Sequence, residues 1–172
     1  MTLNTKLSVP LYTRMGIDVG VLKKQIAKHI SRGIATSSLY AHIARNIDGA
    51  SNIGFNKSMR IARTEGHRIQ VLSANDVQHA AKSKGSEVVK QWDATLDGRT
   101  RPMHILLDGK LAEIDEPFVV DDIEVMYPGG FGISSQDVNC RCALLQRARW
   151  ALDADELKTL KERAEYYGLD KS

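Results

Sequence analysis

The stretch Asn56–Ala94, NKSMRIARTEGHRIQVLSANDVQHAAKSKGSEVVKQWDA, indicates a mixed helix-and-strand fold because its hydrophobic period changes at Gly85. Before the glycine, Met59, Ala62 and the apolar residues that follow them repeat at helical spacing. This spacing predicts a long helix that ends at Gly85, after lysines that suit a helix C-terminus. After the glycine, residues 87–94 are rich in valine and carry Trp92, which predicts a strand.

Two shorter helices are expected before the long one. The first begins at Asp18 as a capping residue and ends near Gly33, and the second runs from residues 36–38 to the break at Gly49–Gly54. Both carry an apolar stripe and a basic outer face. Residues 1–14 alternate only weakly and are expected to form an extended arm.

Short strands and turns follow the long helix. Strands are expected at residues 111–114, 118–120, 123–126 and 138–145, with a short helix at 100–107 capped by Thr100. The glycine-rich residues 127–133 are expected to be irregular, and Asp153 is expected to cap a final amphipathic helix at 154–167. The predicted class is α+β, with an N-terminal arm and two basic helices (1–55), a long helix with an irregular small sheet (56–150) and a C-terminal helix (151–172).

Composition excludes several classes of protein. The 172 residues are 42% hydrophobic and 26% charged, which is typical of a globular chain. No apolar run reaches the roughly 18 residues of a membrane span, no signal peptide is recognised, and two cysteines suit a reducing compartment. The net charge of +3 divides into +8 over residues 1–70 and −5 over residues 71–172. The basic half therefore suits phosphate, an acidic protein surface or simply a solvated helix face.

Two polar groups are candidates for a buried polar core. Arg63 and Glu65 on the long helix form either surface ion pairs or inward-facing anchors. In the turn Asp97–Pro102, Asp97 and Thr100 can accept backbone hydrogen bonds, while Arg99 and Arg101 can fork onto carboxylates or phosphates. This turn is either a self-bonded loop or a ligand-binding one.

The sequence Asn139-Cys140-Arg141-Cys142 suggests a metal site. On a strand, the two thiols would share one face, where a disulfide between them would be strained. Cys140, Cys142 and His104 supply three zinc ligands, and Asp97 or Glu65 is the expected fourth. The alternatives are that the cysteines are small buried hydrophobes or that one forms a nucleophilic pair with His104.

Motifs of several enzyme classes are missing from the sequence. It contains no phosphate-binding glycine loop, no nucleophile elbow and no zinc-protease helix motif. No catalytic residue and no organic cofactor is therefore predicted.

Taken in order, several of these segments resemble the phage Mu F-like minor head protein family. They are Arg60–Glu65, Trp92, Asp97–His104, Leu107–Gly109 and Val138–Cys142. They cover about half of the chain. The stretch Gly129–Gly132 departs from the resemblance, because proline-rich sequence is more usual there.

The resemblance implies a non-enzymatic head morphogenesis protein of a tailed phage or prophage. Such a protein is made in the host cytoplasm, lies inside the virion or procapsid and contacts the portal, other head proteins and packaged double-stranded DNA, but no membrane. The family's shared residues are then expected to form a polar or zinc-stapled core. Its members are Arg63, Glu65, Asp97, Arg99, Thr100, His104, Asn139, Cys140 and Cys142. The rival expectations are a phage-encoded effector, either a metal-dependent hydrolase or an ADP-ribosyltransferase-like enzyme, and a DNA-binding module.

Overall fold

A computed structural model describes residues 19–166 of the chain, with side chains described for residues 20–162. The arm expected at residues 1–14, the Asp18 cap and the end of the last helix at residue 167 lie outside the described residues. The chain divides into two compact units, one ending at Gly66 and the other beginning at His67. This division falls inside the long helix, whereas the sequence placed a boundary at the start of that helix.

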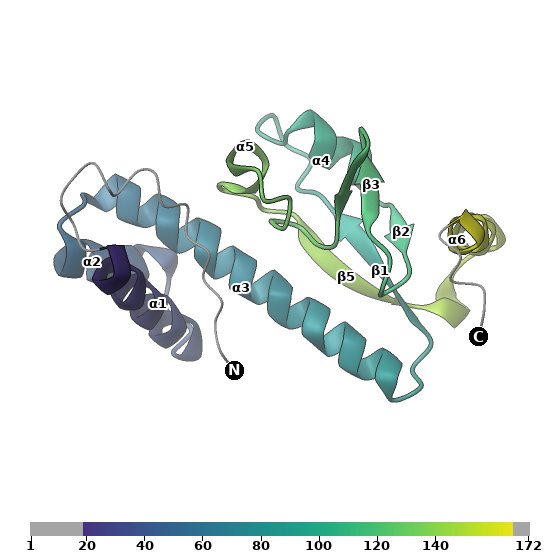
Figure 1. Cartoon of the computed structure of the whole chain (residues 1–172), viewed down its shortest axis with the longest axis horizontal. Coiled ribbons are helices and arrows are strands. Elements are labelled where there is room, and N and C mark those ends of the chain that lie inside the picture. The colour runs from purple at the N-terminus through teal and green to yellow at the C-terminus, as the bar shows by residue number, and fades with distance from the viewer. Residues whose placement is uncertain (1–18, 167–172) are drawn as a thin grey trace. The chain divides into compact units, whose positions relative to one another are not determined.

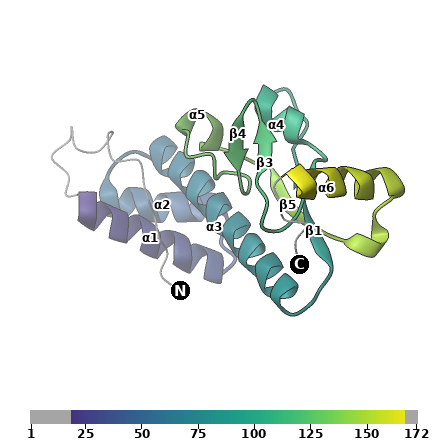
Figure 2. The same cartoon turned by 45° about the vertical axis from the view of Figure 1, so that its right-hand side comes forward.

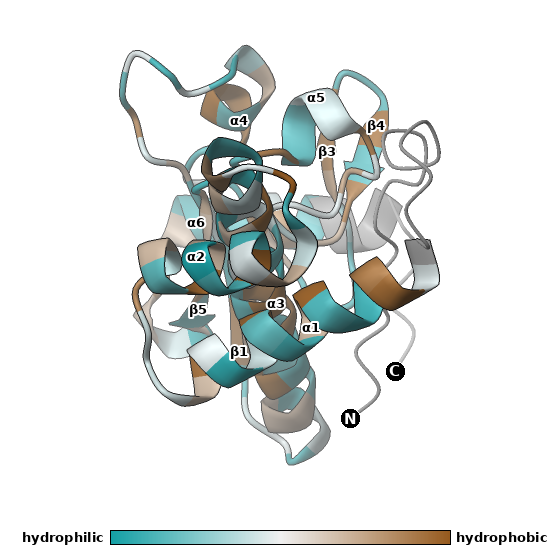
Figure 3. Ribbon diagram, turned by 90° about the vertical axis from the view of Figure 1, so that its left-hand side faces the viewer, coloured by the Kyte–Doolittle hydropathy of each residue, from teal (hydrophilic) through white to brown (hydrophobic). Residues whose placement is uncertain are grey.

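The first unit is helical. It contains α1 (Val19–Ala35), α2 (Tyr40–Ser51) and the beginning of α3 (Phe55–Ser83). Leu22, Ile26 and Ile30 form the buried stripe of α1, so apolar and polar segments alternate along this helix (Figure 3). Helices α1 and α2 pack against each other (Figure 1). They approach so closely at Gly33 that a Cβ atom there would lie 2.3 Å from Cγ1 of Ile43.

The second unit is built on a three-stranded antiparallel sheet in the order β2-β1-β5 (Figure 1). The central strand β1 (Val88–Asp93) pairs with β2 (Leu111–Ala112) on one side and β5 (Ala143–Ala148) on the other. Strands β3 (Phe118–Val120) and β4 (Ile123–Val125) form a separate antiparallel pair. The remaining helices are α4 (Pro102–Leu107), α5 (Ser134–Asp137), the 3-10 helix η3 (Arg149–Ala151) and α6 (Ala154–Tyr166).

Two apolar clusters hold this unit together. The larger one surrounds Trp92, which is fully buried and meets Phe118 edge to face at 5.4 Å between ring centroids. Val71 of α3 joins the same cluster. The smaller cluster joins Val89 and Leu111 to Leu160 of α6, which lies beside the sheet (Figure 2). The Trp92 cluster also contains both cysteines, so the candidate site lies within a packed core.

The α+β class and the order of elements are confirmed, but the last strand was predicted in the wrong place. It begins at Ala143, after both cysteines. The helix α5 occupies residues 134–137, and Asn139 then adopts a left-handed conformation at φ 55°, which interrupts extended structure. Thr100 also does not cap α4, because Arg101 holds the N-cap position and the Thr100 hydroxyl donates to the carbonyl of Thr95.

None of the described helices is both long and apolar enough to span a bilayer.

Candidate metal centre

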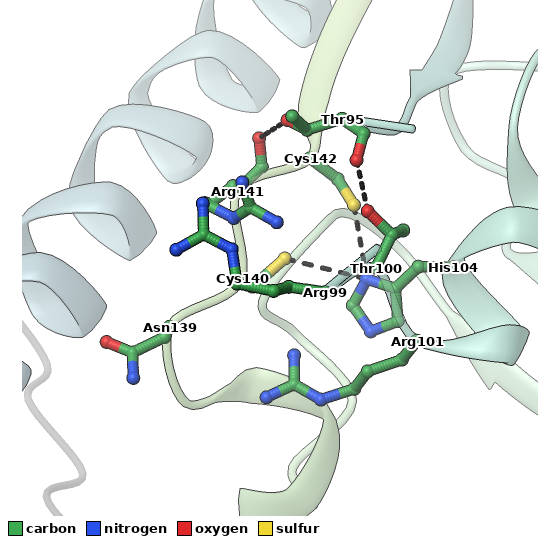
Figure 4. A pocket seen from close by; sticks show the side chains of 9 residues that line it. All are labelled: Thr95, Arg99, Thr100, Arg101, His104, Asn139, Cys140, Arg141 and Cys142. Atoms are coloured by element: carbon green, nitrogen blue, oxygen red, sulfur yellow. Dashed lines mark hydrogen bonds between the residues drawn. The ribbon is translucent and has the colours of Figure 1, made fainter. Parts of the chain in front are cut away.

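His104, Cys140 and Cys142 meet in the interior of the second unit (Figure 4). Nδ1 of His104 lies 3.1 Å from Sγ of Cys142 and 3.8 Å from Sγ of Cys140. Their ligand atoms all lie within 4.8 Å of one another, and all three residues are buried. The sequence predicted this grouping from a strand at residues 138–142, which the structure does not contain. A loop there nevertheless places both sulfur atoms beside the same imidazole.

Two aromatic rings fix the orientation of the His104 ring. Trp92 of β1 meets it edge to face at 5.8 Å, and Phe131 lies over it at 5.3 Å with an interplanar angle of 34°. Phe131 comes from the glycine-rich stretch that was expected to be merely irregular. Its only signal in the sequence was an aromatic residue placed among glycines.

Arg101 ties the start of α4 to the segment that leads into the cysteines. Its guanidinium donates to the carbonyls of Gln136 and Val138 at 3.0 and 2.6 Å. Hydrogen bonds from a charged donor are stronger than neutral ones. Arg101 therefore positions Cys140 relative to His104, although it binds carbonyls rather than the carboxylates or phosphates expected from the sequence.

Asp97 is bound by Arg141 and stands outside the ligand group. Both carboxylate oxygens of Asp97 accept hydrogen bonds from the Arg141 guanidinium, each at 2.7 Å. The backbone N–H of Arg99 donates to the same carboxylate at 2.9 Å. These bonds, those from Arg141 above all, hold the pKa of Asp97 well below its usual range. Asp97 therefore fastens the turn after β1 to the residue between the two cysteines.

The two thiols differ in acidity. A hydrogen bond from Cys140, followed by one from His104, lowers the pKa of Cys142 despite its burial. The same bond to Cys142, together with burial, raises the pKa of Cys140. The pKa values of the two thiols are thus shifted in opposite directions, and Cys142 is the more acidic of the pair.

The geometry fits a tetrahedral zinc ion. With Zn–S near 2.3 Å and Zn–N near 2.0–2.1 Å, tetrahedral ligands place sulfur and nitrogen about 3.6 Å apart. The observed separations of 3.1 and 3.8 Å lie on either side of this value. Two thiol sulfurs and one imidazole nitrogen also form the soft donor set that zinc prefers. Little rearrangement would be needed to bind the ion.

A small cavity of about 20 Å³ lies beside this group and is lined by all three of its members. Arg99, Thr100 and Asn139 also line it. The structure thus brings these three predicted core residues to one place. Thr100 belongs to the turn, whereas Arg99 and Asn139 are exposed at the cavity.

The other two predicted core residues, Arg63 and Glu65, lie on the part of α3 that belongs to the first unit. Arg63 is exposed and Glu65 is buried. Their participation in the cysteine cluster stays a prediction.

Comparison with known proteins gives one family and two relatives. Residues 24–145 match the family described as Phage Mu protein F like protein. The chain is 36% identical over 125 residues to the NAD(+)–arginine ADP-ribosyltransferase EFV of Enterococcus faecalis (strain ATCC 700802 / V583), covering 73% of this chain and 26% of that protein. It is 35% identical over 131 residues to the minor head protein GP7 of Bacillus phage SPP1, covering 72% of this chain and 40% of that protein. This chain therefore spans about a quarter and two fifths of the lengths of these relatives. No solved structure gives a significant match.

Proposed function

We propose, because this chain belongs to the phage Mu protein F-like family of phage head proteins, that it is a non-enzymatic minor head protein of a tailed phage or prophage. In this role it associates with the portal vertex and assists head assembly and DNA packaging or delivery. The observation that carries the proposal is the similarity to a minor head protein over 72% of the chain. The matched segment, residues 24–145, includes His104 and both cysteines.

The buried cluster supports a structural role for these residues. His104 is only 2% exposed, and both cysteines belong to the apolar core around Trp92. A zinc ion held by His104, Cys140 and Cys142 would link α4 to the loop before β5, which lie far apart in the sequence. Zinc would supply a cross-link here, since short strands bury little apolar surface and metal binding contributes folding free energy.

The zinc assignment is tested by elemental analysis of protein purified without chelators. We expect up to one zinc per wild-type chain and a large loss of zinc in the Cys142→Ser variant. Partly exposed His79 of the same unit provides a matched control, and His79→Ala should retain the metal. Wild-type protein that is free of metal, or equal zinc in all three proteins, would contradict the zinc assignment. The cysteines would then be buried thiols of the core.

Head association is tested by quantitative mass spectrometry of purified procapsids and mature virions. The protein is expected in both, in few copies per particle. Particles assembled without the portal should lack it if its place is at the portal vertex. Its absence from both kinds of normal particle would contradict the proposal, and its presence in portal-free particles would contradict the vertex assignment alone.

Contact with packaged DNA is proposed for the first unit, because α1 carries three exposed cations spaced four residues apart. They are Lys24, Lys28 and Arg32. Residues with this spacing lie on one face of a helix. Each phosphate neutralised contributes about −0.9 to the log–log slope of affinity against salt.

Replacing all three cations with alanine should therefore reduce that slope by up to about 2.7 in magnitude. The control is Lys161→Ala on the exposed face of α6, which should have little effect. A salt-independent wild-type interaction would remove DNA from the list of partners.

An enzymatic effector is the second candidate, favoured by the similarity to an arginine ADP-ribosyltransferase. The cavity beside His104, at about 20 Å³, is far too small for a dinucleotide, so NAD⁺ would have to bind elsewhere on the chain. The test is NAD⁺ consumption with an arginine-containing acceptor. Turnover that disappears in Glu65→Gln while folding is retained would favour the enzyme, whereas no turnover by the wild-type chain favours the head protein.

A further inference from the structure

The cavity beside the cysteine cluster is the starting point. Its lining includes His104, Cys140 and Cys142, so it opens directly onto all three candidate ligands (Figure 4). Its volume of about 20 Å³ admits one water-sized species. One atom of an incoming molecule can therefore reach the position next to His104 and the two cysteines, while the rest of that molecule stays outside the cavity.

No carboxylate among the described residues joins the three ligands, and Nε2 of His67, which is buried without a hydrogen-bond partner, is the alternative fourth ligand tested below. Asp97, the residue expected there, is engaged by both nitrogens of Arg141. Within the described residues, the group whose ligand atoms lie within 4.8 Å contains only His104, Cys140 and Cys142. Structural zinc sites are closed by four protein ligands, whereas sites with three keep an exchangeable position.

The mouth of the cavity is positively charged. Arg99, Arg101 and Arg141 line it. The nearby acids are Asp97, which is bound by Arg141, and Asp137, which acts on Cys140 and accepts a hydrogen bond from the Phe131 N–H. The two thiolates would cancel the charge of a divalent ion. The three arginines and two aspartates then leave a formal charge of about +1. The charge of Arg101 is not cancelled by its two carbonyl acceptors.

Arg99 is the most exposed arginine of this rim for which an ion pair is formed. Its side chain is 82% exposed, and its bond to Asp97 is long, at 3.3 Å. The carboxylate of Asp97 is already occupied by two shorter bonds from Arg141. The Arg99 guanidinium can therefore turn toward an anion at the mouth without breaking a strong ion pair.

We propose that the centre keeps an open fourth coordination position that takes one oxygen atom of a small oxyanion, with Arg99 and Arg101 binding the rest of the anion at the rim. A carboxylate and a phosphate both have this chemistry, and the fork of arginine matches both. The inference rests on the metal centre proposed above and adds a ligand site to it.

The test uses the whole chain loaded with Co²⁺ under anaerobic, reducing conditions, with its visible spectrum as the readout. Azide, acetate and inorganic phosphate are titrated separately at constant ionic strength. Azide reports whether the fourth position is open, and the other two anions distinguish a carboxylate from a phosphate ligand. We expect saturable changes in the cobalt bands with azide and with at least one of the two oxyanions.

The rim is tested with Arg99→Ala. Its cobalt spectrum without anions should match that of wild type, while its affinity for the oxyanion should fall about three- to fivefold, as expected for one exposed charge pair. Lys161→Ala on α6 removes the same charge away from the cavity and should bind the oxyanion normally. Equal losses in both variants would overturn the role of Arg99.

Two outcomes would overturn the open position itself. One is a cobalt spectrum that no anion changes. The other is an anion-free spectrum altered by His67→Ala, since Nε2 of His67 is buried without a hydrogen-bond partner and would then be the fourth ligand. In both cases a sulfur-to-cobalt charge-transfer band still supports the metal centre. Loss of that band would remove the centre and the open position together.

Discussion

Zinc should stabilise the second unit against heat, and this effect should depend on Cys142. The ligand atoms of His104 and Cys142 already lie 3.1 Å apart in a packed core. A preorganised site binds without a large cost of ordering. A ligand that binds the folded state but not the unfolded state raises the free energy of unfolding.

The size of the effect follows from mass action. Free zinc at 100 times its dissociation constant adds about 2.7 kcal/mol. The unit from His67 onward has on the order of 100 residues, and for such a unit 1 kcal/mol shifts the melting temperature by about 4–8 °C. We therefore expect an increase of roughly 10–20 °C, measured by differential scanning calorimetry of metal-free and zinc-buffered protein.

Two variants make the measurement specific. Cys142→Ser keeps a small side chain but replaces the soft sulfur ligand, so its melting temperature should respond little to zinc. His79→Ala changes a partly exposed histidine of the same unit and should keep the full response. The reasoning is refuted if wild-type protein does not respond to zinc, or if Cys142→Ser responds as strongly as wild type.

Three further predictions concern packing, pH and helix capping. Gly33→Ala should destabilise the first unit by about 1–3 kcal/mol, because its Cβ would lie 2.3 Å from Ile43. The Cβ of Gly49→Ala would meet nothing within 4 Å, so this helical substitution should stabilise the unit by up to about 1 kcal/mol. Urea denaturation measures both changes. Burial lowers the pKa of His67 below 6.5, so the free energy of unfolding should fall as pH decreases through 6.5 toward the lower folded-state value. The metal-free His67→Gln variant should lose less stability than metal-free wild type between about pH 8 and about pH 5. Parallel curves of stability against pH for the two proteins would contradict this prediction. The side chains of Asp153 and Glu156 each accept a hydrogen bond from the other's backbone N–H, at 2.8 and 3.0 Å. Asp153→Ala should therefore lower the free energy of unfolding by about 1 kcal/mol and speed amide hydrogen exchange in α6. Unchanged exchange in α6 would contradict the capping role.

The helices could be predicted from the sequence because their signals are local. Residues 56–84 carry one periodic stripe and are followed by the terminating Gly85, and the observed helix α3 is Phe55–Ser83. The reciprocal hydrogen bonds of Asp153 and Glu156 likewise follow from residues three positions apart. The strand β1 at Val88–Asp93 agrees with its β-branched composition and its boundary glycine.

The last strand could not be placed because its start depends on backbone geometry that composition does not reveal. Residues 138–142 alternate well enough for a strand, yet Asn139 takes a positive φ and Arg101 binds the carbonyls of Gln136 and Val138. Both features hold this segment as a loop. The pairing of β5 with β1 begins only at Ala143.

The candidate ligands could be chosen from residue types and spacing alone. Only two cysteines exist in the chain, and their spacing with His104 predicts a soft donor set. Their neighbours became visible only in the folded chain, where Phe131 covers the imidazole and Arg141 binds Asp97. This difference arises because side-chain chemistry is encoded residue by residue, whereas contacts between distant residues depend on loop conformation and on competition among hydrogen-bond partners.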